Sequence, residues 1–215
     1  TSNPNSLHLD TMSPLEIVTL MKQEDEQVIK AVNTQLDKIA TVATWGTEAL
    51  YNDGRIIYMG AGTSGRLGVL DAVECPPTFG VDYDKVIGLM AGGEDAFVKA
   101  KEGAEDSEPL GREDLVNLGI TSNDIIIGIA ASGRTPYVIG GLKYAKEMGC
   151  KTATIACNAN SIIGTYADIA IEALTGAEVL TGSTRLKAGS AQKMILNMIS
   201  TAAMIGYGKA YNNLM

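Results

Sequence analysis

The fold class is decided at residues 55–66, RIIYMGAGTSGR, where an apolar run ends in a loop of glycine, serine and threonine. The run from Arg55 to Met59 is apolar without alternation, which is typical of a strand buried on both faces of a sheet. The residues after the loop have helix-forming character, so the stretch predicts a strand, a loop and a helix in succession. Glycine lets backbone approach a ligand closely, and a helix N-terminus directs free N–H groups at an anion.

The same alternation continues along the chain. Further strands are predicted at residues 85–90, 124–130 and 152–157, with a weaker candidate at 169–172. Helical segments lie between them, most clearly at residues 136–148, where apolar residues share one face. The pattern predicts an α/β fold, a parallel sheet with helices on both sides.

Helices are also predicted at both ends of the chain. Ser13, followed by Pro14 and by Glu16, is a capping box that begins a first helix. A second helix is predicted to end near residues 52–54. Residues 188–207 form a last helix whose wide apolar surface indicates a central helix or a subunit contact. The second helix carries one apolar stripe, made of Ile29, Val32, Leu36, Ile39 and Ala43.

Two more loops resemble the first. They are residues 131–135, ASGRT, and residues 181–187, TGSTRLK. Thr135 is a natural N-cap and Pro136 a natural first helical residue, so the second loop lies at the positive end of a helix. Taken alone, that loop is equally well explained as a plain capped turn. Three such loops in a small domain predict a pocket for a phosphorylated molecule.

Composition excludes several function classes. The net charge of −8 argues against nucleic acid or an anionic membrane as a partner, because both need a basic face. Three cysteines without a CxxC pair, and a single histidine, argue against a zinc site or a histidine-dependent triad. Reduced thiols suit the cytosol, and no apolar run approaches the ~20 residues of a membrane span.

The first loop also satisfies the dinucleotide-binding pattern G-x-G-x-x-G, with Gly60, Gly62 and Gly65. That interpretation requires an acidic residue at the end of the next strand. Asp82 has about the right offset, but it precedes that strand. The sequence therefore disfavours a nicotinamide cofactor.

Two carboxylates are candidates for acid–base chemistry. Glu74 precedes Pro76 and Pro77, which should end the short helix after the first loop. The negative end of that helix, and any burial, would favour a protonated carboxyl, which suits a general acid. An exposed glutamate at a helix end is the alternative. Glu105 lies in an acidic stretch, residues 102–108, and composition cannot distinguish it from its neighbours.

Two basic residues lie beside the third loop. Arg185 and Lys187 could hold a substrate anion, although spacing fits exposed basic side chains equally well.

Four strings together resemble the N-acetylmuramic acid 6-phosphate etherases of the SIS (sugar isomerase) superfamily, from about Ser13 to Met215. They are residues 60–68 (GAGTSGRLG), 71–77 (DAVECPP), 131–137 (ASGRTPY) and 181–189 (TGSTRLKAG). The resemblance implies a three-layer, flavodoxin-like doubly wound SIS domain at residues 51–215, which binds a sugar phosphate, after an N-terminal helical segment at residues 1–50. It also implies a further helical segment in family members beyond the equivalent of Met215, where this chain stops.

The resemblance implies a cytoplasmic bacterial enzyme of cell-wall recycling. Such an enzyme cleaves the D-lactyl ether of N-acetylmuramate 6-phosphate to N-acetylglucosamine 6-phosphate and D-lactate, without metal or nicotinamide. It acts as a homodimer with sites near the subunit boundary. Its functional glutamates map onto Glu74, assigned here as the acid, and Glu105, assigned as the base, and the reverse assignment stays open. The predicted substrate-binding residues are Gly62, Thr63, Ser64, Ser132, Gly133, Arg134, Thr135, Arg185 and Lys187.

Two other functions compete with this one. A non-catalytic regulator that senses sugar phosphates needs the same phosphate loops. An aldose–ketose isomerase of hexose 6-phosphates would transfer a proton between C1 and C2 on the same fold, and would leave an ether untouched.

Overall fold

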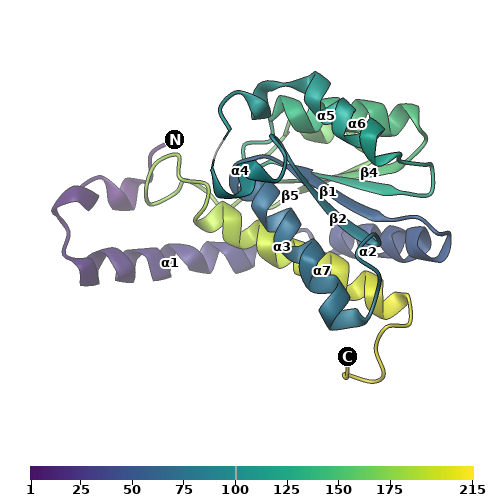
Figure 1. Cartoon of the computed structure of the whole chain (residues 1–215). Coiled ribbons are helices and arrows are strands. Elements are labelled where there is room, and N and C mark those ends of the chain that lie inside the picture. The colour runs from purple at the N-terminus through teal and green to yellow at the C-terminus, as the bar shows by residue number, and fades with distance from the viewer. Residues whose placement is uncertain (100) are drawn as a thin grey trace.

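A parallel sheet of five strands forms the middle of three layers in the computed structural model, which describes residues 1–99 and 101–215 (Figure 1). The strands lie in the order β2-β1-β3-β4-β5. This is the flavodoxin-like doubly wound order that the resemblance implied. The strands are β1 (Ile56–Gly60), β2 (Val86–Met90), β3 (Ile125–Ile129), β4 (Lys151–Ala156) and β5 (Ile169–Glu172).

The strand predictions are confirmed to within about one residue at each end, and β5 has the predicted bounds. Every residue of β1 and β3 is buried, because helices cover both faces of the sheet. Tyr58, in the middle of β1, pairs with Gly88 on one side and with Ile127 on the other. β2 is an edge strand and is only partly buried.

Helices α2, α3 and α7 cover one face of the sheet, and α5 and α6 cover the other (Figure 1). The predicted last helix is central, since its apolar side is buried against the sheet and against α2 and α3. Among the described residues, 1–99 and 101–215, no helix is long and apolar enough to cross a membrane. The helices are α1 (Pro14–Asn33), α2 (Leu36–Tyr51), α3 (Gly62–Phe79), α4 (Asp95–Val98), α5 (Glu108–Leu118), α6 (Pro136–Glu147) and α7 (Lys187–Gly206), with single 3-10 turns η1 (Pro4–Ser6), η2 (Leu9–Thr11), η3 (Ala104–Asp106) and η4 (Ile163–Tyr166).

The N-terminal helix α1 begins at the predicted capping box and projects from the body of the molecule (Figure 1). The predicted second helix is wrong in one respect, because its apolar stripe is divided between two helices. The chain turns at Thr34 and Gln35, so Ile29 belongs to α1 and Leu36 begins α2. Both of these side chains are exposed, while Ile39 is buried in the core.

Helix α3 is longer than predicted. It continues through Pro76 and Pro77 to Phe79, and it ends at Gly80, which has a φ of 62°. Two prolines remove two backbone donors near the end of the helix, but they do not stop it there. The N–H of Gly80 closes the last turn on the carbonyl oxygen of Pro76, at 2.9 Å.

The start of α3 packs directly on the end of β1. A methyl group added at Gly65 would lie 2.7 Å from the carbonyl oxygen of Gly60, which is closer than any real contact. Glycine at position 65 therefore allows the helix to begin against the strand, and this close packing places the first loop at the carboxyl edge of the sheet.

Candidate functional site

The carboxyl ends of β1 and β3 form the switch point of this sheet. The chain leaves β1 toward α3 on one face, and it leaves β3 toward α6 on the other face. The two loops diverge there, and doubly wound folds bind ligands in the crevice at such a point. The first two predicted phosphate loops follow these two strands.

The first loop leads into a helix that has no side-chain cap. Its N-cap residue is Ala61, and Gly62 begins α3 with a φ of 55°. The first N–H groups of α3 therefore remain available to an anion. Ser64 is buried, and its hydroxyl donates to Oε1 of Gln192 on α7 at 3.1 Å. It holds the two helices together, while Thr63 stays partly exposed.

The second loop has the geometry that its sequence predicted. Gly133 has a φ of 71°, and a methyl group there would lie 2.5 Å from Cβ of Ser161, so only glycine fits. Thr135 is the N-cap of α6, but its side chain makes no capping hydrogen bond. Among residues 1–99 and 101–215 this hydroxyl has no hydrogen-bond partner, and it lies beside the exposed side chains of Ser132 and Arg134.

The third loop differs from the other two. The buried carboxylate of Glu178 accepts hydrogen bonds from the N–H groups of Lys187 and Ala188, both at 3.0 Å. The N-terminus of α7 is therefore occupied by the chain itself, and the prediction of a third anion site at a helix N-terminus is wrong. Arg185 in the same loop is exposed.

Lys187 lies away from solvent. Its side chain is 2% exposed, and its ammonium donates to Oε2 of Glu24 on α1 at 2.7 Å. Asn3 and Asn5 also donate to the Glu24 carboxylate. The hydrogen bond from Lys187 is the largest cause that lowers the pKa of Glu24. In this structure Lys187 joins the N-terminal segment to α7 and does not reach the crevice.

The ion pair between Lys187 and Glu24 predicts a stability effect. Replacing Lys187 with Met should lower the free energy of unfolding by about 3 kcal/mol, because it leaves a carboxylate in a mostly buried place without its cation. Urea unfolding measures this loss. The matched control is Lys22→Met, which removes an exposed pair with Glu26 on the same helix and should leave stability unchanged. If Lys187→Met is as stable as the wild-type protein but no longer binds a sugar phosphate, Lys187 belongs to the binding site instead.

Glu74 lies on the side of α3 that faces α7. Its side chain is exposed, and it lines a cavity of about 280 Å³ between the two helices, here called the α3–α7 cavity. The cavity is lined by Leu67, Leu70, Asp71, Glu74, Lys193, Leu196 and Asn197.

Glu105 lies in η3 and lines a different cavity, of about 200 Å³, beside the start of α3. Gly62, Arg66 and Lys101 line the same cavity. Arg66 anchors the chain that leads to Glu105, because its guanidinium donates to two carbonyl oxygens of α4, those of Ala96 at 3.0 Å and Phe97 at 2.8 Å. Glu105 thus lines a cavity that some of its acidic neighbours in residues 102–108 do not line.

The two glutamates are not brought together within one chain. Glu105 shares a cavity with Gly62, the first residue of α3, and Glu74 is twelve positions further along that helix. At a rise of about 1.5 Å per residue, twelve positions span about 18 Å. The two cavities also open on different sides of α3, toward α4 and toward α7.

No local sequence pattern marks Asp71, whose carboxyl group lies beside the α3–α7 cavity. Asp71 is buried where β1, α3 and α7 meet, and it accepts hydrogen bonds from the hydroxyls of Tyr58 at 2.8 Å and Ser200 at 3.1 Å. Burial raises the pKa of Asp71 to about 6. With the Asn197 amide oriented to satisfy both of its neighbours, its nitrogen donates to the same carboxylate at 3.0 Å and its oxygen accepts from the ammonium of Lys193 at 2.7 Å.

Three further features bear on the site. Nε2 of Gln192 is buried and has no partner among the residues that the structure describes. Cys75 is also buried, which raises the pKa of its thiol to about 12 and agrees with a structural role. Asp82 precedes β2, so the strand that follows the G-x-G-x-x-G motif ends at Met90 without the acidic residue of a dinucleotide site.

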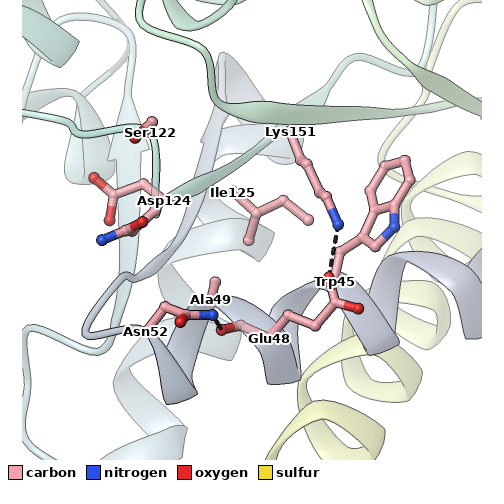
Figure 2. A pocket seen from close by; sticks show the side chains of 9 residues that line it. Trp45, Glu48, Ala49, Asn52, Ser122, Asp124, Ile125 and Lys151 are labelled. Atoms are coloured by element: carbon pink, nitrogen blue, oxygen red, sulfur yellow. Dashed lines mark hydrogen bonds and ion pairs between the residues drawn. The ribbon is translucent and has the colours of Figure 1, made fainter.

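Another cavity, of about 150 Å³, lies at the opposite edge of the sheet (Figure 2). Lys151, at the start of β4, pairs with Glu48 at 2.6 Å and lies over the ring of Trp45 (Figure 2). Because this cavity is at the amino ends of the strands, it is separate from the phosphate loops.

Comparison with known proteins agrees with this geometry. Residues 26–146 match the family described as glucokinase regulatory protein N-terminal SIS domain, and residues 110–202 match the SIS domain family. Over 213 residues, the chain is 58% identical to the N-acetylmuramic acid 6-phosphate etherase of Francisella tularensis subsp. novicida (strain U112), covering 99% of this chain and 72% of that protein. The etherase of Enterobacter sp. (strain 638) is 57% identical, with the same coverage.

Solved structures share the fold at low sequence identity. A phosphoheptose isomerase from Francisella tularensis has a TM-score of 0.66 and 16% identity, covering 89% of this chain and 98% of its own. The NanR protein of Vibrio vulnificus, complexed with ManNAc-6P, has a TM-score of 0.65 and 15% identity, covering 90% of this chain and 64% of its own.

Proposed function

The chain belongs to the N-acetylmuramic acid 6-phosphate etherases, a family of SIS-domain lyases, and we propose that the crevice at its carboxyl edge performs this family's reaction. The substrate is N-acetylmuramate 6-phosphate, and the products are D-lactate and N-acetylglucosamine 6-phosphate. The reaction recycles amino sugars of the cell wall. Two observations together carry the proposal. Two glycine-containing loops without side-chain caps lie at the switch point of the sheet, and the sequence is 58% identical to an etherase.

In this proposal the 6-phosphate binds at the second loop. Ser132 and Thr135 supply hydroxyls, Gly133 lets the backbone come close, and the N-terminus of α6 directs the positive end of its dipole at the phosphate. Arg134 is exposed beside them and adds positive charge. Thr63 and the first turn of α3 face the sugar hydroxyls.

The chemistry is an elimination followed by a hydration. In the open-chain sugar the C2 proton is acidic because C2 is next to the aldehyde, so a carboxylate base can remove it. The electron pair forms the C2–C3 double bond, and the C3–O bond breaks as an acid protonates the departing D-lactate. Water then adds at C3, and a proton returns to C2. The two carboxyl groups must be in different protonation states, with Glu74 as the acid and Glu105 as the base.

We propose further that the working site is completed across a homodimer. Glu74 and Glu105 line separate cavities on different sides of α3, and Glu74 lies about 18 Å along the helix from Gly62, which lines the cavity of Glu105. One C2–C3 bond therefore does not reach both carboxyl groups of a single chain. A twofold dimer can bring Glu74 of one subunit to Glu105 of the partner subunit. Exposed apolar side chains on α1 and α3, Leu15, Val18, Leu70 and Val73, support such a contact. The three buried, unpaired cysteines suit a cytoplasmic location.

The decisive experiment measures D-lactate released from N-acetylmuramate 6-phosphate by the purified protein. Lactate release with formation of N-acetylglucosamine 6-phosphate is expected. Tight binding without lactate would instead indicate a regulator that senses sugar phosphates. Interconversion of hexose 6-phosphates without ether cleavage would indicate an aldose–ketose isomerase.

A further inference from the structure

The α3–α7 cavity carries a cation that the proposed reaction has not yet used. Lys193 lies on one wall, on α7, and Glu74 on the opposite wall, on α3. Leu67, Leu70 and Leu196 supply the apolar part of the lining. The cavity thus combines one positive charge, an apolar surface and a carboxyl group that the reaction assigns to the departing oxygen.

The ammonium of Lys193 lies beside a neutral amide, that of Asn197. With this amide oriented to satisfy both of its neighbours, its oxygen accepts from Lys193 at 2.7 Å and its nitrogen donates to Asp71 at 3.0 Å. Asp71 is in turn held by Tyr58 and Ser200. Within the described part of the chain, no carboxylate lies within ion-pair distance of Lys193. Its other N–H donors are therefore available to a ligand.

These features suit a short carboxylate with a small apolar group. A carboxylate oxygen makes a charge-assisted hydrogen bond to an ammonium, and a methyl group packs on leucine side chains. The lactyl arm of the proposed substrate has one carboxylate, one methyl group and an ether oxygen on the carbon between them. Each of these three parts has a matching group in the cavity.

We propose that the α3–α7 cavity is the subsite for the lactyl arm, with Lys193 binding its carboxylate and the leucines its methyl group. This inference rests on the proposed function and names the part of the site that recognises the ether substituent. Arg185 and Lys187 were the sequence candidates for holding a substrate anion, and Lys187 is paired with Glu24, so Lys193 takes this role toward the lactyl carboxylate. This subsite also places Glu74 beside the departing oxygen, where a general acid acts.

The test compares substrate and product on the variant Lys193→Met, which keeps most of the unbranched side chain and removes the charged nitrogen. The KM for N-acetylmuramate 6-phosphate should rise about ten- to a hundredfold, the usual range for a lost hydrogen bond to a charged group. The affinity for N-acetylglucosamine 6-phosphate should not change, because this product has no lactyl arm. Lys193→Arg should keep most of the substrate affinity, and it shows whether the position tolerates substitution.

Lys146→Met is the matched control, since it removes a lysine from α6, on the other face of the sheet. It should leave both affinities unchanged. An unchanged KM for the substrate in Lys193→Met, with an active wild-type protein, overturns the lactyl subsite. An equal loss of affinity for substrate and product overturns it as well, because the lysine would then hold the sugar or its phosphate. A wild-type protein that releases no lactate contradicts the proposed function instead.

Discussion

Replacing Glu105 with Gln is expected to reduce lactate release by about 10²- to 10⁴-fold, the usual contribution of a positioned acid or base. Glutamine keeps the size of the side chain but cannot accept the C2 proton. Glu74→Gln should cause a loss of the same order, because an unprotonated lactate oxygen is a poor leaving group. Both rates come from the D-lactate assay. The matched control is Asp106→Asn, which changes the next residue of η3, outside the cavity lining.

Exchange of the C2 proton with deuterium from the solvent separates the two roles. Glu74→Gln should still exchange this proton in the substrate without releasing lactate, because the base is intact. Glu105→Gln should lose exchange and elimination together. The opposite pattern would exchange the assignments of acid and base, and near-normal turnover in either variant would remove that glutamate from the mechanism.

Mixing the two inactive variants is expected to restore activity. If each site takes Glu74 from one subunit and Glu105 from the partner subunit, a heterodimer of Glu74→Gln and Glu105→Gln contains one intact site and one doubly altered site. Random reassociation makes half of the dimers mixed, so an equal mixture should reach about a quarter of the wild-type rate. This is far above the rate of either variant alone.

The measurement requires that subunits exchange, which two affinity tags on the two variants can verify. A mixture that forms heterodimers but stays as inactive as its components would show that both glutamates act from the same chain. In that case α3 and the segment that carries Glu105 must move relative to the structure described here, since their cavities open on different sides of α3.

Much of the fold was predictable from local pattern. The strands were found because a parallel strand covered on both faces is a short continuous apolar run. The start of α1 was found because a capping box is a local signal, and Ser13 and Glu16 form it as expected. The conformation of the second loop, residues 131–135, was predictable for the same reason, since Gly133 and Thr135 have roles that depend on backbone conformation close by in the sequence.

Each wrong prediction rests on a local sequence pattern that does not by itself determine the structure at that place. Pro76 and Pro77 are local stop signals, but α3 packs along β1 and β2 and continues past them. The turn at Thr34 and Gln35 does not interrupt the spacing of the apolar residues. Two helices therefore show the periodicity of one helix. The third loop resembles an anion site, but Glu178 caps the helix that follows it.

By itself, then, the sequence determined the sheet, its helices on both sides, the family and the conformation of the two loops that we propose bind the substrate, because these depend on patterns over a few neighbouring residues. Only the tertiary structure decided what each charged side chain contacts. Lys187 does not face the crevice, because it pairs with Glu24, which lies 163 positions away in the sequence. Lys193 lies opposite Glu74 because α7 packs on α3. Charge interactions depend on distance and burial in space, and spacing along the chain does not contain that information.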